Sequence, residues 1–381
     1  MTENVQQNQG TEVDMLAAAK DAQWSAGTFL GPGSIKLVAP AKVNLLLAIG
    51  ARRDDGYHEV ENIMHALALH DTLYLHTEAL TDDELARAAA DLAEAYQTAA
   101  ECEGATDAPD GRRRLARAAA LVAAQAVGGP ADNVLVSIDL ADRTGQNLVV
   151  PAADNLAFKA ADRLARALGR TAPEKISLRI EKYIPAQGGL GGGSSNAAAV
   201  LVGLAQQWNV AADDPRVLEV AQGLGADVAF FLHGGCALLE GAGEREAHRL
   251  TPSNHALVLV KPPTGVSTAE AYRRFDENPQ PVPEVVLEVA RSAREAAEVP
   301  LANNLGPAAE SLLPVLVDIR TWLTEAVGAQ NVLLCGSGAT TFALVDSFDT
   351  ARTLATQASA RGWWGRPTNL SGLRAAVVPG R

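Results

Sequence analysis

Residues 185–208, PAQGGLGGGSSNAAAVLVGLAQQW, decide the interpretation of the chain, because five glycines occupy six positions directly before an amphipathic helical pattern. Glycine has no side chain, so its backbone N–H groups can approach an anion closely. A helix that begins there adds unpaired amides and about half a positive charge. Residues 188–196 therefore predict a phosphate cradle, with hydroxyl and amide groups at its mouth.

Two better-known glycine loops do not fit this segment. Gly188 and Gly193 have the separation of the GxxxxGK[ST] loop, but Ser194 stands where that loop has lysine. The GxGxxG dinucleotide pattern also fails, since the third glycine is replaced by Ser194 or Asn196 in the two possible registers. A flexible Gly-Ser linker is the remaining alternative. It is less favoured because the loop joins a strand to a long apolar helix without a polar spacer.

Composition sets limits on the class of protein. The chain has 381 residues, 48% hydrophobic and 20% charged, which favours a globular protein of two domains. Its formal net charge is -13 at pH 7, with 32 Lys and Arg against 45 Asp and Glu. This balance argues against general nucleic-acid binding, which depends on neutralising phosphates. An anionic substrate would have to be held by a local site.

The cysteines and the first residues indicate a compartment. Cys102, Cys236 and Cys335 lie far apart and are odd in number, which is typical of reduced thiols in a cytosolic protein. No HExxH motif or Cys/His cluster predicts a metal cage, so any metal is expected to arrive with a ligand. The first 20 residues are polar and acidic, and no apolar run approaches the roughly 20 residues that span a bilayer. We expect a cytoplasmic protein without a membrane partner.

The order of strand-like and helix-like segments predicts an α+β fold in two domains. Residues 1–33 are expected to form a loosely ordered tail, residues 34–250 an N-terminal domain and residues 254–381 a C-terminal domain. Segments of both kinds alternate without the regular short rhythm of a doubly wound sheet. The Ala-rich residues 78–132 interrupt the first domain and predict two helices or partly disordered chain.

Three further features are each ordinary when taken alone. Lys42 and Asn44 are two apart in a strand and share one face, which an edge strand would also explain. Asp227 stands between a helix stop and an apolar strand-like run, where a turn or helix cap is the usual reason. Gly336 and Gly338 predict a tight turn.

Together these stretches resemble the GHMP small-molecule kinases over most of residues 34–381. The segment 185–200, PAQGGLGGGSSNAAAV, is similar to the Pro-x-x-x-Gly-Leu-Gly-Ser/Gly-Ser-Ser signature of that family. PAKVNLLLAIGARRDDGYHEVENIM and LGADVAFFLHGG resemble one branch of it. That branch transfers the γ-phosphate of ATP to the 2-hydroxyl of 4-diphosphocytidyl-2-C-methyl-D-erythritol in the non-mevalonate isoprenoid pathway. The resemblance implies the two-domain GHMP-kinase fold, ATP and Mg²⁺ as cofactors, and a cytidyl-diphosphate-linked methylerythritol as small-molecule substrate.

The resemblance also assigns roles to single residues. It implies Lys42 and Asp227 as catalytic residues, with Asp227 accepting the hydroxyl proton of the substrate. It implies Asn44, Tyr57, His58 and Tyr272 as substrate-binding residues, with the aromatic groups at the cytosine. It implies an ATP site made of Pro185, Gly188, Gly189, Leu190, Gly191, Gly192, Gly193, Ser194, Ser195, Asn196 and Asn155. Ser195 is the candidate magnesium ligand.

Two departures and two alternatives remain open at this level. Gln187 replaces a glycine common in the family loop, and could narrow the cradle or point outward. The segment 78–132 is longer than the family usually carries, and could be a helical interaction arm. The substrate could instead be that of a homoserine, galactose or mevalonate kinase, or the chain could be a catalytically silent nucleotide-binding regulator. The sequence allows a monomer or a homodimer.

Overall fold

The structure is a computed structural model, and it describes residues 31–54, 56–103, 133–146, 150, 154–211 and 213–379, with the side chains of 94–103 left out. The predicted tail falls almost wholly outside these ranges. So does the second helix expected within the Ala-rich segment. The first helix of that segment is described and is given below.

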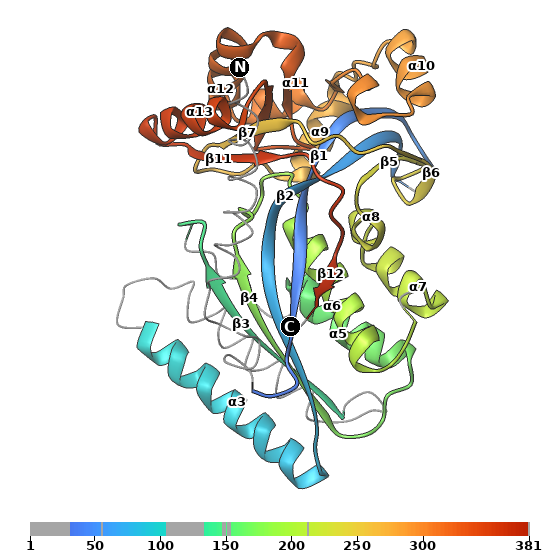
Figure 1. Cartoon of the computed structure of the whole chain (residues 1–381), viewed down its shortest axis with the longest axis vertical. Coiled ribbons are helices and arrows are strands. Elements are labelled where there is room, and N and C mark those ends of the chain that lie inside the picture. The colour runs from blue at the N-terminus through green and yellow to red at the C-terminus, as the bar shows by residue number, and fades with distance from the viewer. Residues whose placement is uncertain are drawn as a thin grey trace, which may run out of the picture.

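A mixed sheet of eight strands forms one half of the molecule (Figure 1). Its main path runs in the order β12-β1-β2-β4-β3; off this path, β5 pairs with β2 and β6, and β8 pairs with β1. The strands are β1 (Ile35–Arg52), β2 (His58–Ala79), β3 (Val134–Asp142), β4 (Glu174–Lys182), β5 (Cys236–Glu240), β6 (Arg245–Leu250), β8 (Ala302–Asn303) and β12 (Ala376–Val378). β1 and β2 form one long antiparallel pair that reaches from one half of the molecule to the other.

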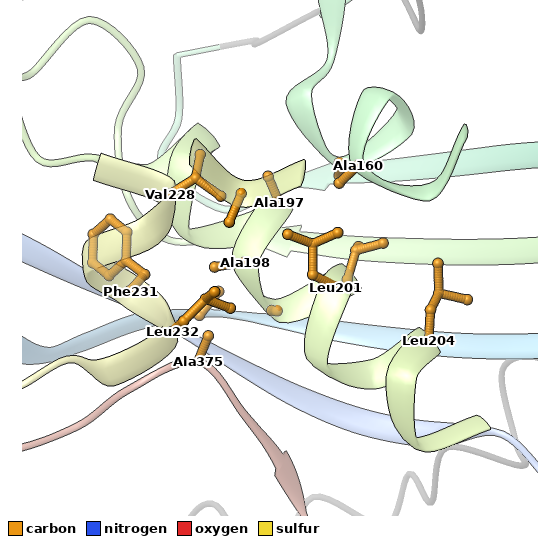
Figure 2. Close-up of a cluster of buried hydrophobic side chains, with 14 of the residues drawn as sticks. Ala160, Ala197, Ala198, Leu201, Leu204, Val228, Phe231, Leu232 and Ala375 are labelled. Carbon is orange, nitrogen blue, oxygen red and sulfur yellow. The ribbon is translucent and has the colours of Figure 1, made fainter. Parts of the chain in front are cut away.

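Four helices cover this sheet and enclose its core. They are α5 (Leu156–Ala167), α6 (Gly192–Gln207), α7 (Pro215–Leu224) and α8 (Ala226–His233). Figure 2 shows Ala198, Leu201 and Leu204 of α6 and Phe231 and Leu232 of α8 as parts of this core. α6 is buried over most of its surface rather than along one face, so the amphipathic pattern expected there is wrong. At Gly203 a Cβ atom would lie 3.0 Å from the methyl groups of Leu37, so glycine lets α6 pack closely on β1.

A second sheet of four antiparallel strands has the order β11-β7-β10-β9. Its strands are β7 (Ala256–Lys261), β9 (Val332–Leu334), β10 (Thr341–Val345) and β11 (Trp364–Asn369). The helices of this half are α9 (Thr268–Glu277), α10 (Glu284–Ser292), α11 (Gly306–Leu312), α12 (Val315–Val327) and α13 (Phe348–Ala360). Two sheets with helices segregated around them confirm the predicted α+β class.

Two elements connect or extend this frame. β12 follows the second sheet in sequence but pairs with β1, so the chain returns to the first sheet before its end. The helix α3 (Asp82–Glu103) follows β2 and packs through Leu85, Ala88 and Ala89 against Leu135 of β3. It lies at the far end of the first sheet from the second sheet (Figure 1).

Two local predictions are corrected by the structure. The sequence predicts Asp154 as the N-cap of the helix that follows it, but Asn155 caps α5, because its side-chain oxygen accepts a hydrogen bond from the N–H of Ala157 at 2.9 Å. Asp227 precedes no strand: it lies in the first turn of the short helix α8, which begins directly after Gly225. The apolar run that resembled a strand is helical because its residues pack against α6 in the core.

Candidate active site

The glycine loop, residues 185–193, lies between the two sheets and leads into α6. Gly191 is the N-cap of α6 with φ 71°, and Gly189 has φ 72°, conformations that favour glycine. A Cβ atom at Gly189 would lie 2.1 Å from the carbonyl oxygen of Cys335, and one at Gly191 would lie 2.9 Å from the ring of Phe231. Gly193, by contrast, is exposed and would meet only Leu156, at 3.8 Å. Several glycines of the loop are thus required by the protein's own packing, and the helix start near Gly193 is the part open to a ligand.

Lys42 and Asn44 of β1 form the polar face that the sequence predicted. The backbone N–H of Lys42 donates to the carbonyl oxygen of Leu190 at 3.0 Å, which fixes β1 to the glycine loop. Its Nζ donates to Oδ1 of Asn44 at 2.9 Å, and Nδ2 of Asn44 donates to Oδ1 of Asn62 at 2.7 Å. Both Lys42 and Asn44 are buried. The ammonium is therefore held in one place beside the loop.

Asp227 faces this ammonium from α8. Its Oδ2 lies 3.6 Å from Nζ of Lys42, and its side chain is 34% exposed whereas that of Lys42 is 6% exposed. The first turn of a helix favours a negative charge. The structure thus brings the two predicted catalytic residues together, with a carboxylate that is oriented by a cation yet open to solvent. Such a carboxylate can accept a proton from a hydroxyl group placed next to it.

Tyr272 of α9 and His58 of β2 are two further predicted site residues, and their rings are in contact. Burial, and then the negative charge of Asp227, raise the pKa of the Tyr272 phenol. The rings of His58 and Tyr272 have centroids 5.4 Å apart. Nε2 of His58 lies 2.7 Å from Oδ1 of Asp276, so the imidazole is anchored to α9.

Tyr57, the other predicted aromatic, is mostly exposed. Its side chain is on the surface, with 66% of the residue exposed. An exposed aromatic ring that is next in sequence to a buried histidine can stack on a planar ligand. The structure therefore brings His58 and Tyr272 together and leaves Tyr57 at the rim.

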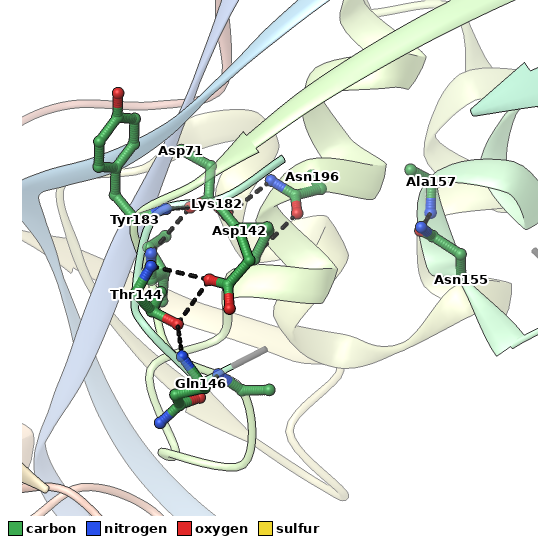
Figure 3. Close-up of polar contacts among 11 residues, drawn as sticks. Asp71, Asp142, Thr144, Gln146, Asn155, Ala157, Lys182, Tyr183 and Asn196 are labelled. Carbon is green, nitrogen blue, oxygen red and sulfur yellow. Dashed lines mark hydrogen bonds and ion pairs between the residues drawn. The ribbon is translucent and has the colours of Figure 1, made fainter. Parts of the chain in front are cut away.

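A buried ionic cluster lies beneath the start of α6, and the sequence did not predict it (Figure 3). Lys182 of β4 pairs with Asp71 of β2, and its Nζ also donates to Oδ1 of Asn196 at 3.2 Å. Nδ2 of Asn196 donates to Asp71 at 2.9 Å, and the N–H groups of Tyr183 and Ile184 donate to the other Asp71 oxygen at 2.7 and 2.9 Å. We call Asp71, Lys182 and Asn196 the closed cluster.

The closed cluster changes the role expected for Asn196. The sequence placed its side chain at the mouth of the cradle, but both ends of its amide are bonded within the cluster. Asn155 is similarly engaged by the N–H of Ala157. The remaining part of the cradle consists of backbone amides, Ser194 and Ser195.

Ser195 carries the observation that bears on a metal ion. It is fully buried in the first turn of α6, and its Oγ has no hydrogen-bond partner within the described part of the chain. A free hydroxyl there and the Asp227 carboxylate are oxygen donors, the type that Mg²⁺ prefers. Among the described residues no group of three or more His, Cys, Asp or Glu could hold a metal by itself. A cation bound here would need further oxygen ligands, which a phosphate would supply.

Gln187 points away from the cradle. Its φ is 51°, and a Cβ atom at Gly265 would lie 2.5 Å from its Oε1, so the side chain lies against the segment that follows β7. Its carbonyl oxygen accepts the N–H of Ala339 at 3.2 Å. Gln187 therefore does not narrow the phosphate side of the loop, and it joins the loop to the second sheet.

Lys182 is one residue that the sequence analysis missed although its strand carries a signal for it. In β4 the residues Ile176, Leu178 and Ile180 alternate on the buried face, and Lys182 continues that register. A charged residue at a buried register position needs a partner, which is Asp71 here. Asp276 carries no such signal, because only the packing of α9 brings it to His58.

In the described part of the chain no helix is long and apolar enough to cross a membrane.

Two family profiles match this chain. The profile of the GHMP kinases N terminal domain matches residues 155–235, and the profile of the GHMP kinases C terminal matches residues 286–362. The first includes the glycine loop and Asp227, and the second lies within the half that contains the second sheet.

Curated relatives match most of the chain. One from Pelotomaculum thermopropionicum, named 4-diphosphocytidyl-2-C-methyl-D-erythritol kinase, is 36% identical and covers 84% of this chain and 92% of its own length. A relative with the same name from Streptomyces coelicolor is 34% identical, covering 81% of this chain and 86% of its own length.

Solved structures agree with these matches. A crystal structure of 4-(cytidine 5'-diphospho)-2C-methyl-D-erythritol kinase has a TM-score of 0.57 at 28% identity, covering 88% of this chain and all (100%) of the other. A crystal structure of a homoserine kinase from Cytophaga hutchinsonii has a TM-score of 0.54 at 18% identity. The match covers 91% of this chain and 97% of the other, and it supports the fold alone.

Proposed function

The chain belongs to the GHMP kinases and, within them, to the family of 4-diphosphocytidyl-2-C-methyl-D-erythritol kinases, and on this premise we propose that it phosphorylates the 2-hydroxyl of that cytidyl compound with ATP. This reaction belongs to the non-mevalonate isoprenoid pathway. The observation that carries the proposal is the Lys42–Asp227 pair, 3.6 Å apart, between the helix start at the glycine loop and the aromatic contact of His58 with Tyr272.

In this proposal Asp227 takes the proton and Lys42 compensates the charge. Asp227 accepts the proton of the substrate hydroxyl and aims its oxygen at the γ-phosphate. Lys42 offsets the negative charge that develops during transfer, and Asn44 keeps the ammonium in place. The support is that one carboxylate is both oriented by a buried cation and reachable from solvent.

The phosphates of ATP occupy the start of α6. Backbone amides near Gly193 and the positive end of the helix hold them, with Ser194 alongside. Mg²⁺ would be held by Ser195 and the phosphates, and its chemistry is the neutralisation of phosphate charge. The support is the unpartnered, fully buried hydroxyl of Ser195.

The cytidyl group occupies the space beside His58, between Tyr57 and Tyr272. Aromatic faces bind a planar base by stacking, and an imidazole offers hydrogen bonds to its edge. Asp276 holds the His58 ring in orientation. This end of the site separates the proposed substrate from homoserine, galactose and mevalonate, which have no base.

An assay of ADP release with a panel of acceptors tests the proposal. We expect turnover with 4-diphosphocytidyl-2-C-methyl-D-erythritol and ATP, and ³¹P NMR should place the new phosphate on the 2-hydroxyl. Homoserine, galactose and mevalonate should give no more ADP than ATP alone. Turnover with one of them and none with the cytidyl compound would overturn the substrate, while nucleotide binding without any transfer would favour a silent regulator.

A further inference from the structure

Lys261, the last residue of β7, is a buried lysine that the mechanism above does not use. The strand alternates between two cores: Ala256, Val258 and Val260 pack in the cluster that includes residues of α12 and α13. Leu257 and Leu259 pack on the opposite face, in the cluster that contains Ile184 and Leu190 of the glycine-loop segment. Lys261 has the same register as these two leucines, so its side chain is directed toward the glycine loop.

The contacts of Lys261 agree with this direction. Its Cδ lies 3.5 Å from the point where a Cβ atom of Gly188 would be, and Oγ1 of Thr340 lies 2.7 Å from the same point. Lys261 is 2% exposed, and its Nζ donates to the carbonyl oxygen of Pro262 at 3.1 Å. Oγ1 of Thr340 is buried and has no partner within the described residues. The back of the loop therefore holds an amine with spare donors next to a free hydroxyl.

No negative charge balances Lys261 in the described part of the chain. Burial lowers the pKa of its amine, and no charged neighbour contributes to that shift. The two other buried lysines near the glycine loop each have an acidic partner: Lys42 pairs with Asp227, and Lys182 pairs with Asp71. On the neighbouring strand β11, Arg366 is exposed. A buried ammonium without a counter-ion is unfavourable, and an anion bound beside Lys261 would compensate its charge.

We propose that Lys261 supplies positive charge to the phosphate end of the nucleotide site, acting across Gly188. The glycine loop has Ser194 where the GxxxxGK[ST] loop has its lysine, and in this chain the second domain provides a cation from behind. Lys261 is a supporting residue: it acts through space on the phosphates rather than on the reacting hydroxyl. The inference rests on the proposed binding of ATP at residues 188–196.

Nucleotide affinity as a function of ligand charge tests this inference. Calorimetry would measure the affinity of the full-length Lys261→Met chain for each nucleotide. The substitution should weaken the binding of ATP about tenfold, should weaken the binding of ADP and AMP progressively less, and should leave the binding of adenosine unchanged. Lys261→Arg should restore the preference for ATP over adenosine. Lys36→Met is the matched control: Lys36 is a half-buried lysine of β1 that pairs with Val378 and Tyr74, and its loss should leave all four affinities unchanged.

Thermal unfolding of the same variants separates charge from structure. Lys261→Met without ligand should melt at the same temperature as the wild type or higher, because an apolar side chain replaces an unpaired buried charge. Equal weakening of all four ligands, unchanged ATP affinity, or failure of Lys261→Met to fold would each overturn the inference. If the wild-type chain bound no nucleotide, the proposed ATP site would fail first and the inference with it.

Discussion

Two polar clusters lie on either side of the glycine loop, and they differ in how their hydrogen-bonding capacity is used. In the closed cluster, Asp71, Lys182 and Asn196 are nearly or fully buried and are bonded to one another and to backbone N–H groups. In the second group, which we call the open cluster, Lys42 and Asn44 are buried but Asp227 is 34% exposed on its side chain.

The difference separates a structural role from a chemical one. The closed cluster ties β2, β4 and α6 together, and a Cβ atom at Gly192 would lie 2.9 Å from Nζ of Lys182. Its charges are matched inside the protein, so it fixes the start of α6. The open cluster keeps one carboxylate oriented and accessible, which a proton acceptor requires. Substitutions in the closed cluster should therefore change stability, and substitutions in the open cluster should change rate.

The largest expected effect is the loss of phosphate transfer in Asp227→Asn. The amide keeps the shape of the side chain but accepts protons poorly, so kcat should fall about 10²–10⁴-fold. Steady-state ADP release measures this, with circular dichroism as a check of folding. Asp349→Asn is the control, since Asp349 also lies in the first turn of a helix but is exposed. A kcat within threefold of the wild type would remove Asp227 from the proposed mechanism.

Asp71→Asn should lower the free energy of unfolding by about 3–5 kcal/mol. The substitution leaves the Lys182 ammonium buried without its counter-ion, which is costlier than losing the pair. Urea denaturation followed by fluorescence measures the change. Asp139→Asn, at an ion pair whose carboxylate is 62% exposed, should cost less than about 1 kcal/mol. Similar losses for the two variants would contradict a structural role for the closed cluster.

Acid should destabilise the protein through His65, which joins β2 to the segment between the sheets. Its Nδ1 donates to Ala66 O at 2.8 Å and its Nε2 accepts the N–H of Ser253 at 2.9 Å, so both nitrogens are occupied in the neutral ring. Burial lowers the pKa of His65 from 6.5 to about 4. The unfolded chain binds the proton more readily, so this stability is complete above pH 6.5 and is lost as the pH falls toward 4.

The size of this effect is on the order of 2–3 kcal/mol across that interval. Denaturation curves between pH 4 and 7 measure it. His65→Gln should flatten the dependence, whereas His70→Gln, at an intermediate position on β2, should keep the wild-type slope. An unchanged slope in His65→Gln would show that other groups set the acid sensitivity.

Tyr272→Ala should have the smallest effect. This substitution tests the proposed cytosine site, which adjoins the open cluster. Loss of the aromatic wall should raise KM for the cytidyl substrate about tenfold and leave KM for ATP unchanged. Tyr272→Phe keeps the ring and should retain most of the affinity. Equal changes in the two KM values would indicate a general loss of packing by α9.

Much of this arrangement could be predicted from the sequence, and the failures have physical reasons. Lys42 and Asn44 were predicted to share a face because strand geometry has a fixed period of two. Asp227 was assigned to a turn before a strand, because a run as short as VAFFL has no period that separates a strand from a buried helix. The engagement of Asn196 could not be foreseen, since its partners Asp71 and Lys182 are distant in sequence.

Single-turnover transfer measures the contrast between the two clusters most directly. Asp227→Asn and Asp71→Asn, each loaded with saturating ATP and 4-diphosphocytidyl-2-C-methyl-D-erythritol at a temperature where it is folded, would be compared with the wild type by rapid quench. We predict that Asp71→Asn transfers phosphate within about threefold of the wild-type rate per folded molecule, while Asp227→Asn is slower by about 10²-fold or more. Wild-type transfer in Asp227→Asn, or an equal loss in both variants, would contradict the assignment of chemistry to the open cluster.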